Sequence, residues 1–150
     1  MQTLVVGYGN TLRRDDGLGI RAAEALLSSP LPPGVTVLTC QQLLPELAAT
    51  LAKFDQVIFM DASAPGFLSR RAGAIQSLFV HPHDTQPAGI THFFGPTALL
   101  ALAHTLYGRA PAARLFTMQA DNFDLSEELS PVVAAALPDL LAQVRACFAE

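Results

Sequence analysis

A short apolar run that breaks into glycines and then into two acids constrains the fold more than any other stretch. The strand expected at residues 2–6 ends in the apolar run Leu4-Val5-Val6, as in a strand that is covered on both faces of a sheet. Gly7 and Gly9 turn the chain, Asp15 and Asp16 follow, and an amphipathic helical pattern begins directly behind them. The chain therefore opens with a strand, a glycine turn and a helix, which is the first unit of a sheet with helical crossovers.

A nucleotide or flavin site is the first alternative for such a unit. That site requires free backbone N–H groups and positive potential at the helix N-terminus, whereas Asp15 and Asp16 place two negative charges there. The glycine spacing also departs from the dinucleotide fingerprint, since the third glycine should fall where Leu12 stands. The acids favour a cation or a proton transfer instead, although either of them also suits a helix cap.

The bulk composition is that of one globular domain over residues 1–150. The chain is 51% hydrophobic and 15% charged and has a net charge of -4, which argues against disorder and nucleic-acid binding. No basic segment precedes the first apolar run, and no apolar stretch approaches the roughly 18 residues of a membrane span. Cys40 and Cys147 have no CxxC spacing, so neither a zinc knuckle nor a disulfide framework is indicated. We expect a cytoplasmic protein without membrane contact.

Strand-like and helix-like patterns alternate along the whole chain. Strands are expected at 2–6, 35–39, 56–61, 74–80 and 113–119, and helices at 16–27, 44–51, 96–107 and 131–148, with a polar loop at 62–72. This order predicts an α/β fold, a mostly parallel five-stranded sheet with helices on both faces, in a three-layer sandwich. Ligands of such sheets bind beyond the carboxyl ends of the strands, at a topological switch point.

Three polar residues fall at positions that this architecture exposes to one cleft. Asp16 follows the first strand, Asp61 ends the third, and His92 lies in the loop before the helix at 96–107. Two carboxylates about 4 Å apart repel each other by about 4 kcal/mol at an effective dielectric of 20, so a metal, a cationic group or a proton must accompany them. An added imidazole favours a borderline divalent metal, although His92 is also of the type that forms hydrogen bonds at a helix start.

Other reactive residues are less promising. His81, His83 and Asp84 could hold a metal, but a solvated loop after an edge strand explains them more simply. Cys40 has no local group to activate it, and no Gly-x-Ser-x-Gly elbow is present. Catalysis by carboxylic acids or by a metal is therefore the remaining interpretation.

Several stretches resemble one known family. They are Gly7-Tyr8-Gly9-Asn10-Thr11-Leu12-Arg13-Arg14-Asp15-Asp16-Gly17-Leu18-Gly19, then Phe59-Met60-Asp61-Ala62, Thr91-His92, and Asp124-Leu125-Ser126-Glu127-Glu128-Leu129-Ser130-Pro131. In content, order and spacing the chain resembles the nickel–iron hydrogenase maturation proteases from about residue 1 to residue 148. The resemblance implies an α/β sheet flanked by helices and an endopeptidase that trims the C-terminal extension of the hydrogenase large-subunit precursor.

The resemblance also implies roles for particular residues. Asp16, Asp61 and His92 would contact a nickel ion that the precursor carries, and Asp16 and Asp61 would serve catalysis. We further expect Gly9, Asn10 and Asp15 to bind the substrate. The partner would be the nickel-loaded precursor, and no permanently bound cofactor is expected. The alternatives are a non-catalytic checkpoint or chaperone for nickel insertion, and a metallohydrolase with its own resident metal.

Overall fold

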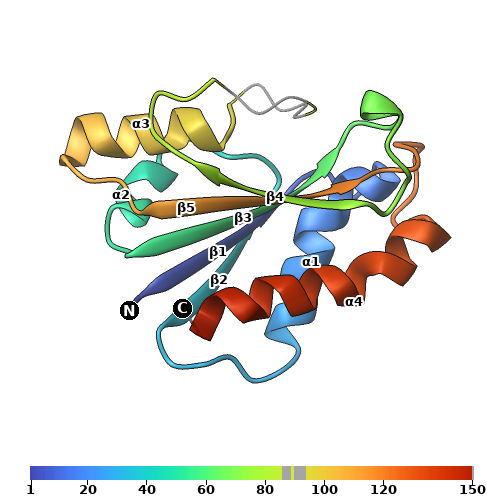
Figure 1. Cartoon of the computed structure of the whole chain (residues 1–150), viewed down its shortest axis with the longest axis horizontal. Coiled ribbons are helices and arrows are strands. Elements are labelled where there is room, and N and C mark those ends of the chain that lie inside the picture. The colour runs from blue at the N-terminus through green and yellow to red at the C-terminus, as the bar shows by residue number, and fades with distance from the viewer. Residues whose placement is uncertain (86–88, 90–93, 150) are drawn as a thin grey trace.

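The chain forms one five-stranded sheet in the order β2-β1-β3-β5-β4 (Figure 1). The computed structural model describes residues 1–85, 89 and 94–149. Four strands are parallel, and β4 joins β5 in antiparallel register at the edge. The strands are β1 (Thr3–Tyr8), β2 (Val35–Cys40), β3 (Gln56–Ser63), β4 (Ile75–Val80) and β5 (Ala112–Gln119). The predicted α/β class with a mostly parallel five-stranded sheet is confirmed.

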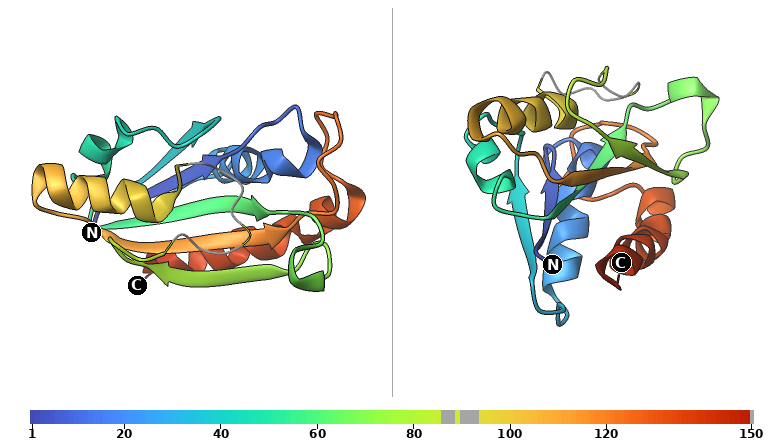
Figure 2. Two further views of the ribbon diagram at one scale, coloured as in Figure 1. Left: turned by 90° about the horizontal axis from the view of Figure 1, so that it is seen from above. Right: turned by 60° about the vertical axis from the view of Figure 1, so that its left-hand side comes forward.

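Helices cover both faces of this sheet (Figure 2). One apolar cluster packs α1 (Leu18–Leu27) and α4 (Pro131–Ala146) on one face, and a second packs α2 (Leu47–Leu51) and α3 (Pro96–Tyr107) on the other. Short 3-10 turns occur at η1 (Arg14–Gly17), η2 (Phe67–Ser69) and η3 (Cys147–Ala149). The result is the expected three-layer sandwich.

Two predicted boundaries are wrong in ways that bear on the site. The helix expected from residue 16 begins as η1 and becomes α-helical only at Leu18. The loop expected from residue 62 starts later, because β3 continues to Ser63 in register with β5. Both differences coincide with tertiary contacts: β5 supplies backbone partners to Ala62 and Ser63, and the backbone of η1 donates to the carbonyl oxygens of Ser126 and Asn122.

The strand order creates a switch point between β1 and β3. The chain leaves β1 through α1 toward β2 and then returns through α2 to the other side of β1, where β3 lies. Loops diverge at such a point and leave room for a ligand beyond the carboxyl ends of the strands. We call the end of the sheet at which the parallel strands finish the carboxyl edge, and the end at which they begin the amino edge.

Glycines allow α1 to lie very close to β1. A Cβ atom on Gly7 would stand 2.0 Å from the carbonyl oxygen of Gly19, and one on Gly19 would stand 2.3 Å from that of Met60. No side chain fits in either place. The glycines of this segment therefore serve close packing of helix on strand, and not the approach of a phosphate.

The last helix corrects one expectation. Residues 131–149 form a 19-residue helical segment with a mean hydropathy of 1.5, long and apolar enough by those two measures to cross a membrane. The sequence analysis expected no apolar stretch of that length. Val133, Leu140 and Val144 of this segment are buried in the core against the sheet, and 22% of the 18-residue window that meets both measures is buried.

Candidate functional site

Asp16 lies in η1, immediately beyond β1 at the carboxyl edge. Its side chain is buried, with 5% exposure, and one carboxylate oxygen accepts a hydrogen bond from the backbone N–H of Asn10 at 3.2 Å. Gly9 makes this arrangement possible, because its φ is 141° and a Cβ there would stand 1.9 Å from the carbonyl oxygen of Asp16. The turn thus folds back on the end of β1, and η1 also contacts β3.

Asp61 lies near the end of β3 and is fully buried. Val57 and Phe59 belong to the cluster under α2 and α3, so the alternation of the strand places Asp61 on that same face. Its Oδ1 accepts a hydrogen bond from the backbone N–H of Ala62 at 2.8 Å. The predicted acid at the end of an apolar strand is therefore present, inside the fold at the switch point.

Tyr8 is a neighbour of Asp61 that sequence reasoning missed. Burial raises the pKa of the Tyr8 phenol well above its ordinary value, and the charge of Asp61 and a side-chain hydrogen bond with it raise that pKa further. The Tyr8 ring also packs edge-on against Phe59, with centroids 6.5 Å apart. Tyr8 therefore stays a neutral phenol beside the carboxylate.

Register extends this polar row across the sheet. Cys40 is the partner of Tyr8 on β2, and Thr117 is the partner of Asp61 on β5. Gln119 follows on the same face of β5, is 1% exposed, and donates from Nε2 to the carbonyl oxygen of Ala64. The available signal was that polar residues interrupt apolar strands at neighbouring ends, but only the register shows that they adjoin.

Asp15 differs from Asp16 although the two are adjacent. It is fully buried, and its carboxylate accepts hydrogen bonds from Ser130 and from the backbone of the segment after β5. Its known bonds are thus internal to the fold, which favours the capping alternative over a substrate contact. The helix involved is not α1, because Ser130 is the N-cap residue of α4.

Among the remaining candidates, His92 lies outside the described residues. Within the part of the chain that the structure describes, no three His, Cys, Asp or Glu side chains are grouped closely enough to hold a metal. His81 and His83 are exposed, and the His83 ring packs against His104 with centroids 5.9 Å apart. The metal interpretation of the loop at residues 81–84 therefore gains no support.

The two cysteines behave as packing residues. Burial raises the pKa of the Cys40 thiol, which disfavours the reactive thiolate. Cys147 is buried, and its sulfur accepts a hydrogen bond from Arg114 at 3.0 Å. Neither arrangement favours cysteine as the nucleophile.

The electrostatics of the carboxyl edge suit acid or metal chemistry. Buried carboxylates lose hydration and must be compensated by hydrogen bonds, by a cation or by a proton. The helix α3 runs antiparallel to β5, so its N-terminus faces the carboxyl edge (Figure 1), and its first turn holds no acid. The partial positive charge at that terminus favours negative charge at the edge.

Known proteins share the fold of this chain. The hydrogenase 2 maturation protease of Escherichia coli K12 is 29% identical over 160 aligned positions, which cover 100% of this chain and 92% of that protein. The structure of the E. coli hydrogenase maturating endopeptidase HybD superposes with a TM-score of 0.79 at 28% identity, over 96% of this chain and 90% of that one.

The likeness extends to a distant relative. The [NiFe] hydrogenase maturation protease HybD of Thermococcus kodakarensis has the same fold, with a TM-score of 0.78 at 23% identity, over 98% of this chain and 99% of that one. No protein-family model matches the chain. The agreement with the E. coli proteins nevertheless extends over nearly the full length of both chains, in sequence and in fold.

The chain is similar to hydrogenase maturation proteases over its whole length, in sequence and in fold. It is accordingly a peptidase, and its carboxyl edge holds the acids that the sequence analysis assigned to the site. The structure places Asp16 and Asp61 on contacting elements, η1 and β3, and binds the Asn10 backbone to Asp16.

Proposed function

We propose that this maturation protease recognises nickel in a hydrogenase large-subunit precursor and removes the C-terminal extension of that precursor, in the cytoplasm. The observation that carries the proposal is a pair of buried acids on contacting elements at the switch point, in a chain that matches a maturation protease over its whole length. The nickel ion belongs to the substrate, and the protease holds no permanent metal.

Recognition would depend on the charge of two buried carboxylates, to which the precursor's nickel ion would bring positive charge. Asp16, Asp61 and His92 would complete the coordination shell of the precursor's nickel ion with two oxygens and one imidazole nitrogen. A precursor without nickel would cover these carboxylates without supplying a cation, at a cost in desolvation. Discrimination thus rests on a penalty for the wrong partner as much as on attraction for the right one.

Cleavage is proposed to use a water molecule. One carboxylate accepts a proton from the water molecule while the water oxygen attacks the scissile carbonyl carbon. The carboxyl group then passes that proton to the departing amine as the C–N bond breaks. Direct attack by an aspartate is the alternative. Gly9 and Asn10 would lie against the substrate peptide, because they form the turn beside Asp16.

The decisive experiment incubates the purified protease with precursor that has been loaded with nickel or kept free of it, and weighs the products by mass spectrometry. Only the nickel-loaded precursor should lose the mass of its extension, and Asp16→Ala and His92→Ala should abolish that loss while the variants keep the wild-type fold. An unchanged precursor mass would instead favour the checkpoint or chaperone. Stoichiometric zinc after dialysis would favour a metallohydrolase with a resident metal.

A further inference from the structure

Asp15 is a buried acid to which the proposed cleavage assigns no chemical step. Its Oδ1 accepts the backbone N–H of Ser130 at 2.8 Å. Its Oδ2 accepts the Ser130 hydroxyl at 2.8 Å and the backbone N–H groups of Asp121 and Asn122 at 2.9 and 3.3 Å. A carboxylate offers about four acceptor positions, so these four donors satisfy it from one segment, residues 121–130.

The same segment also binds the backbone of the turn. Arg14 donates its N–H to the carbonyl oxygen of Ser126 at 2.9 Å, and Ser126 donates to that of Leu12 at 3.0 Å, which forms an isolated parallel bridge. Arg14 has a φ of 46°, in the left-handed region that a non-glycine residue adopts only where its surroundings hold it. Residues 121–130 therefore hold the turn through both side chain and backbone.

The consequence concerns Asp16, the next residue in the same 3-10 turn. Asp15 and Asp16 extend from one short turn, so a carboxylate held by residues 121–130 determines how the turn is rotated. That rotation decides where the Asp16 carboxylate lies relative to the N–H of Asn10, 3.2 Å away. A turn without this anchor would be free to relax its Arg14 strain and carry Asp16 with it.

We infer that Asp15 is a positioning residue, which ties η1 to the segment before α4 and thereby sets the Asp16 carboxylate at the carboxyl edge. The inference concerns a role through Asp16, and its kinetic part rests on the proposed function. Two adjacent acids then have separate tasks: Asp15 positions the turn, and Asp16 acts toward the substrate.

The test compares Asp15→Asn with Asp124→Asn, the same chemical change at an exposed acid of the segment whose side chain takes no part in the bonds to the turn. In Asp15→Asn an amide NH₂ group replaces one carboxylate oxygen, and as a donor it cannot accept hydrogen bonds from the N–H groups that face it. We expect kcat for nickel-loaded precursor to fall about tenfold or more, as displaced catalytic groups do, at a temperature where the variant is fully folded. Asp124→Asn should keep the wild-type kcat. A merely structural role would lower the melting temperature and leave the kcat of the folded protein unchanged, which would overturn the inference.

A second readout needs no substrate. The ¹⁵N–¹H resonance of Asn10 reports its hydrogen bond to Asp16, so Asp15→Asn should displace it and Asp124→Asn should not. An unmoved Asn10 resonance in folded Asp15→Asn would overturn the inference even if processing were lost. Conversely, if the wild-type protein processed no precursor, the proposed function would fail while this measurement still decided the role of Asp15.

A milder variant covers the case in which Asp15→Asn does not fold. Ser130→Ala removes one of the four hydrogen bonds and keeps the backbone donor of that residue. We expect a smaller displacement of the Asn10 resonance in the same direction. An Asn10 resonance identical to wild type in Ser130→Ala would then count against the inference.

Discussion

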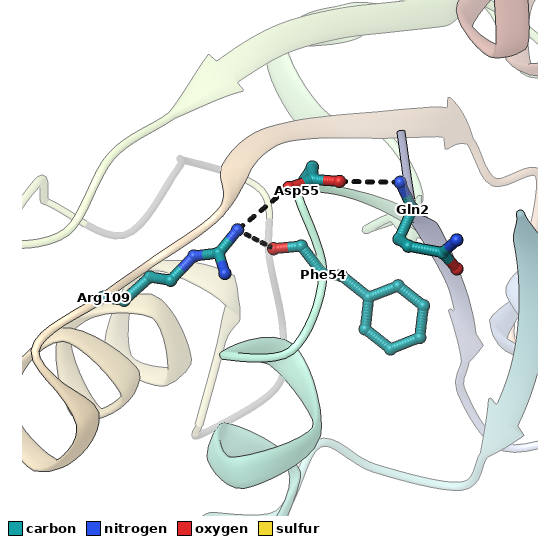
Figure 3. Close-up of polar contacts among 4 residues, drawn as sticks. All are labelled: Gln2, Phe54, Asp55 and Arg109. Atoms are coloured by element: carbon teal, nitrogen blue, oxygen red, sulfur yellow. Dashed lines mark hydrogen bonds and ion pairs between the residues drawn. The ribbon is translucent and has the colours of Figure 1, made fainter.

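The two edges of the sheet treat an aspartate in opposite ways. At the amino edge, Asp55 is about half exposed and accepts hydrogen bonds from the Gln2 N–H at 2.7 Å and from Arg109 at 3.0 Å (Figure 3). At the carboxyl edge, Asp61 is fully buried and accepts the Ala62 N–H beside the Tyr8 phenol. Water and a guanidinium compensate the first charge, whereas the second is kept in a dry site.

The proposed function gives these two acids different roles, a structural one for Asp55 and a chemical one for Asp61. Arg109 also donates to the carbonyl oxygen of Phe54 at 3.1 Å, so the Asp55 contacts join α2, β1, β3 and the α3–β5 connection into a brace (Figure 3). An exposed ion pair of this kind changes the free energy of folding little, because both of its partners stay in contact with water. A buried carboxylate costs stability unless it is compensated, and the proposed role in cleavage would account for an acid at the switch point.

Replacing Asp61 should have the largest effect. Asp61→Asn keeps an acceptor for the Ala62 N–H but removes the charge, so we expect processing of nickel-loaded precursor to fall on the order of 10²-fold or more. The free energy of unfolding of Asp61→Asn should stay the same or rise, because the substitution removes a buried charge. Asp55→Asn is the matched control and should process normally. Processing by Asp61→Asn within a few-fold of wild type would erase the contrast between the two edges.

The tight turn at the carboxyl edge should come next. In Gly9→Ala the new Cβ would meet the Asp16 carbonyl oxygen at 1.9 Å in a backbone region that disfavours side chains. We expect a loss of about 3 kcal/mol in the free energy of unfolding, measured by urea denaturation. Gly66→Ala has a φ of 74° with nothing within 4 Å of the new Cβ, so it should cost only about 1 kcal/mol. Equal costs at both positions would show that the close approach at Gly9 is not needed.

Tyr8→Phe should have a moderate effect. The substitution keeps the ring contact with Phe59 and removes only the hydroxyl that is hydrogen-bonded to Asp61. We expect a loss of about 1 kcal/mol in stability and a several-fold fall in processing, since Asp61 loses one of the groups that orient it. An unchanged rate with an unchanged unfolding midpoint would remove Tyr8 from the description of the site.

The smallest effect belongs to the amino edge. The Gln2 backbone hydrogen bond, and after it the Arg109 hydrogen bond and charge, lower the pKa of Asp55. A lowered folded pKa means that this stabilisation is present above about pH 4, the ordinary value of the unfolded side chain, and is lost as the pH falls through the folded value. Wild type should therefore be slightly more stable than Asp55→Asn at pH 7, and the two should converge in acid. A gap that persists at pH 2 would mean that packing rather than charge sustains the brace.

Much of the fold was readable because it depends on local patterns. The helix predicted at 96–107 has those bounds, with Pro96 in its first turn and Gly108 left-handed at its end, since both are local preferences of the backbone. The strands were found because a central parallel strand must be apolar on both faces. The boundaries at Leu18 and Ser63 were not, since they depend on partners far along the chain.

The site was predicted in its position and only partly in its contacts. Asp16 and Asp61 fall where strand ends and the switch point predict them. Their roles in nickel recognition and catalysis, like that of His92, remain predictions. The sequence did not predict Tyr8 as a partner of Asp61. A single aromatic residue in an apolar strand indicates nothing unusual, and only the strand register shows that a carboxylate lies beside it.

The amino-acid sequence by itself determined the alternating elements, the acids at the strand ends and the resemblance to the maturation proteases, because periodicity, turn residues and motif spacing are properties of the chain itself. Only the tertiary structure decided that Asp15 binds residues 121–130 while Asp16 binds the turn at Asn10. Two identical side chains, one peptide apart, cannot be told apart by composition. They differ because the fold brings different hydrogen-bond donors to each, from segments more than a hundred residues away in one case and six in the other.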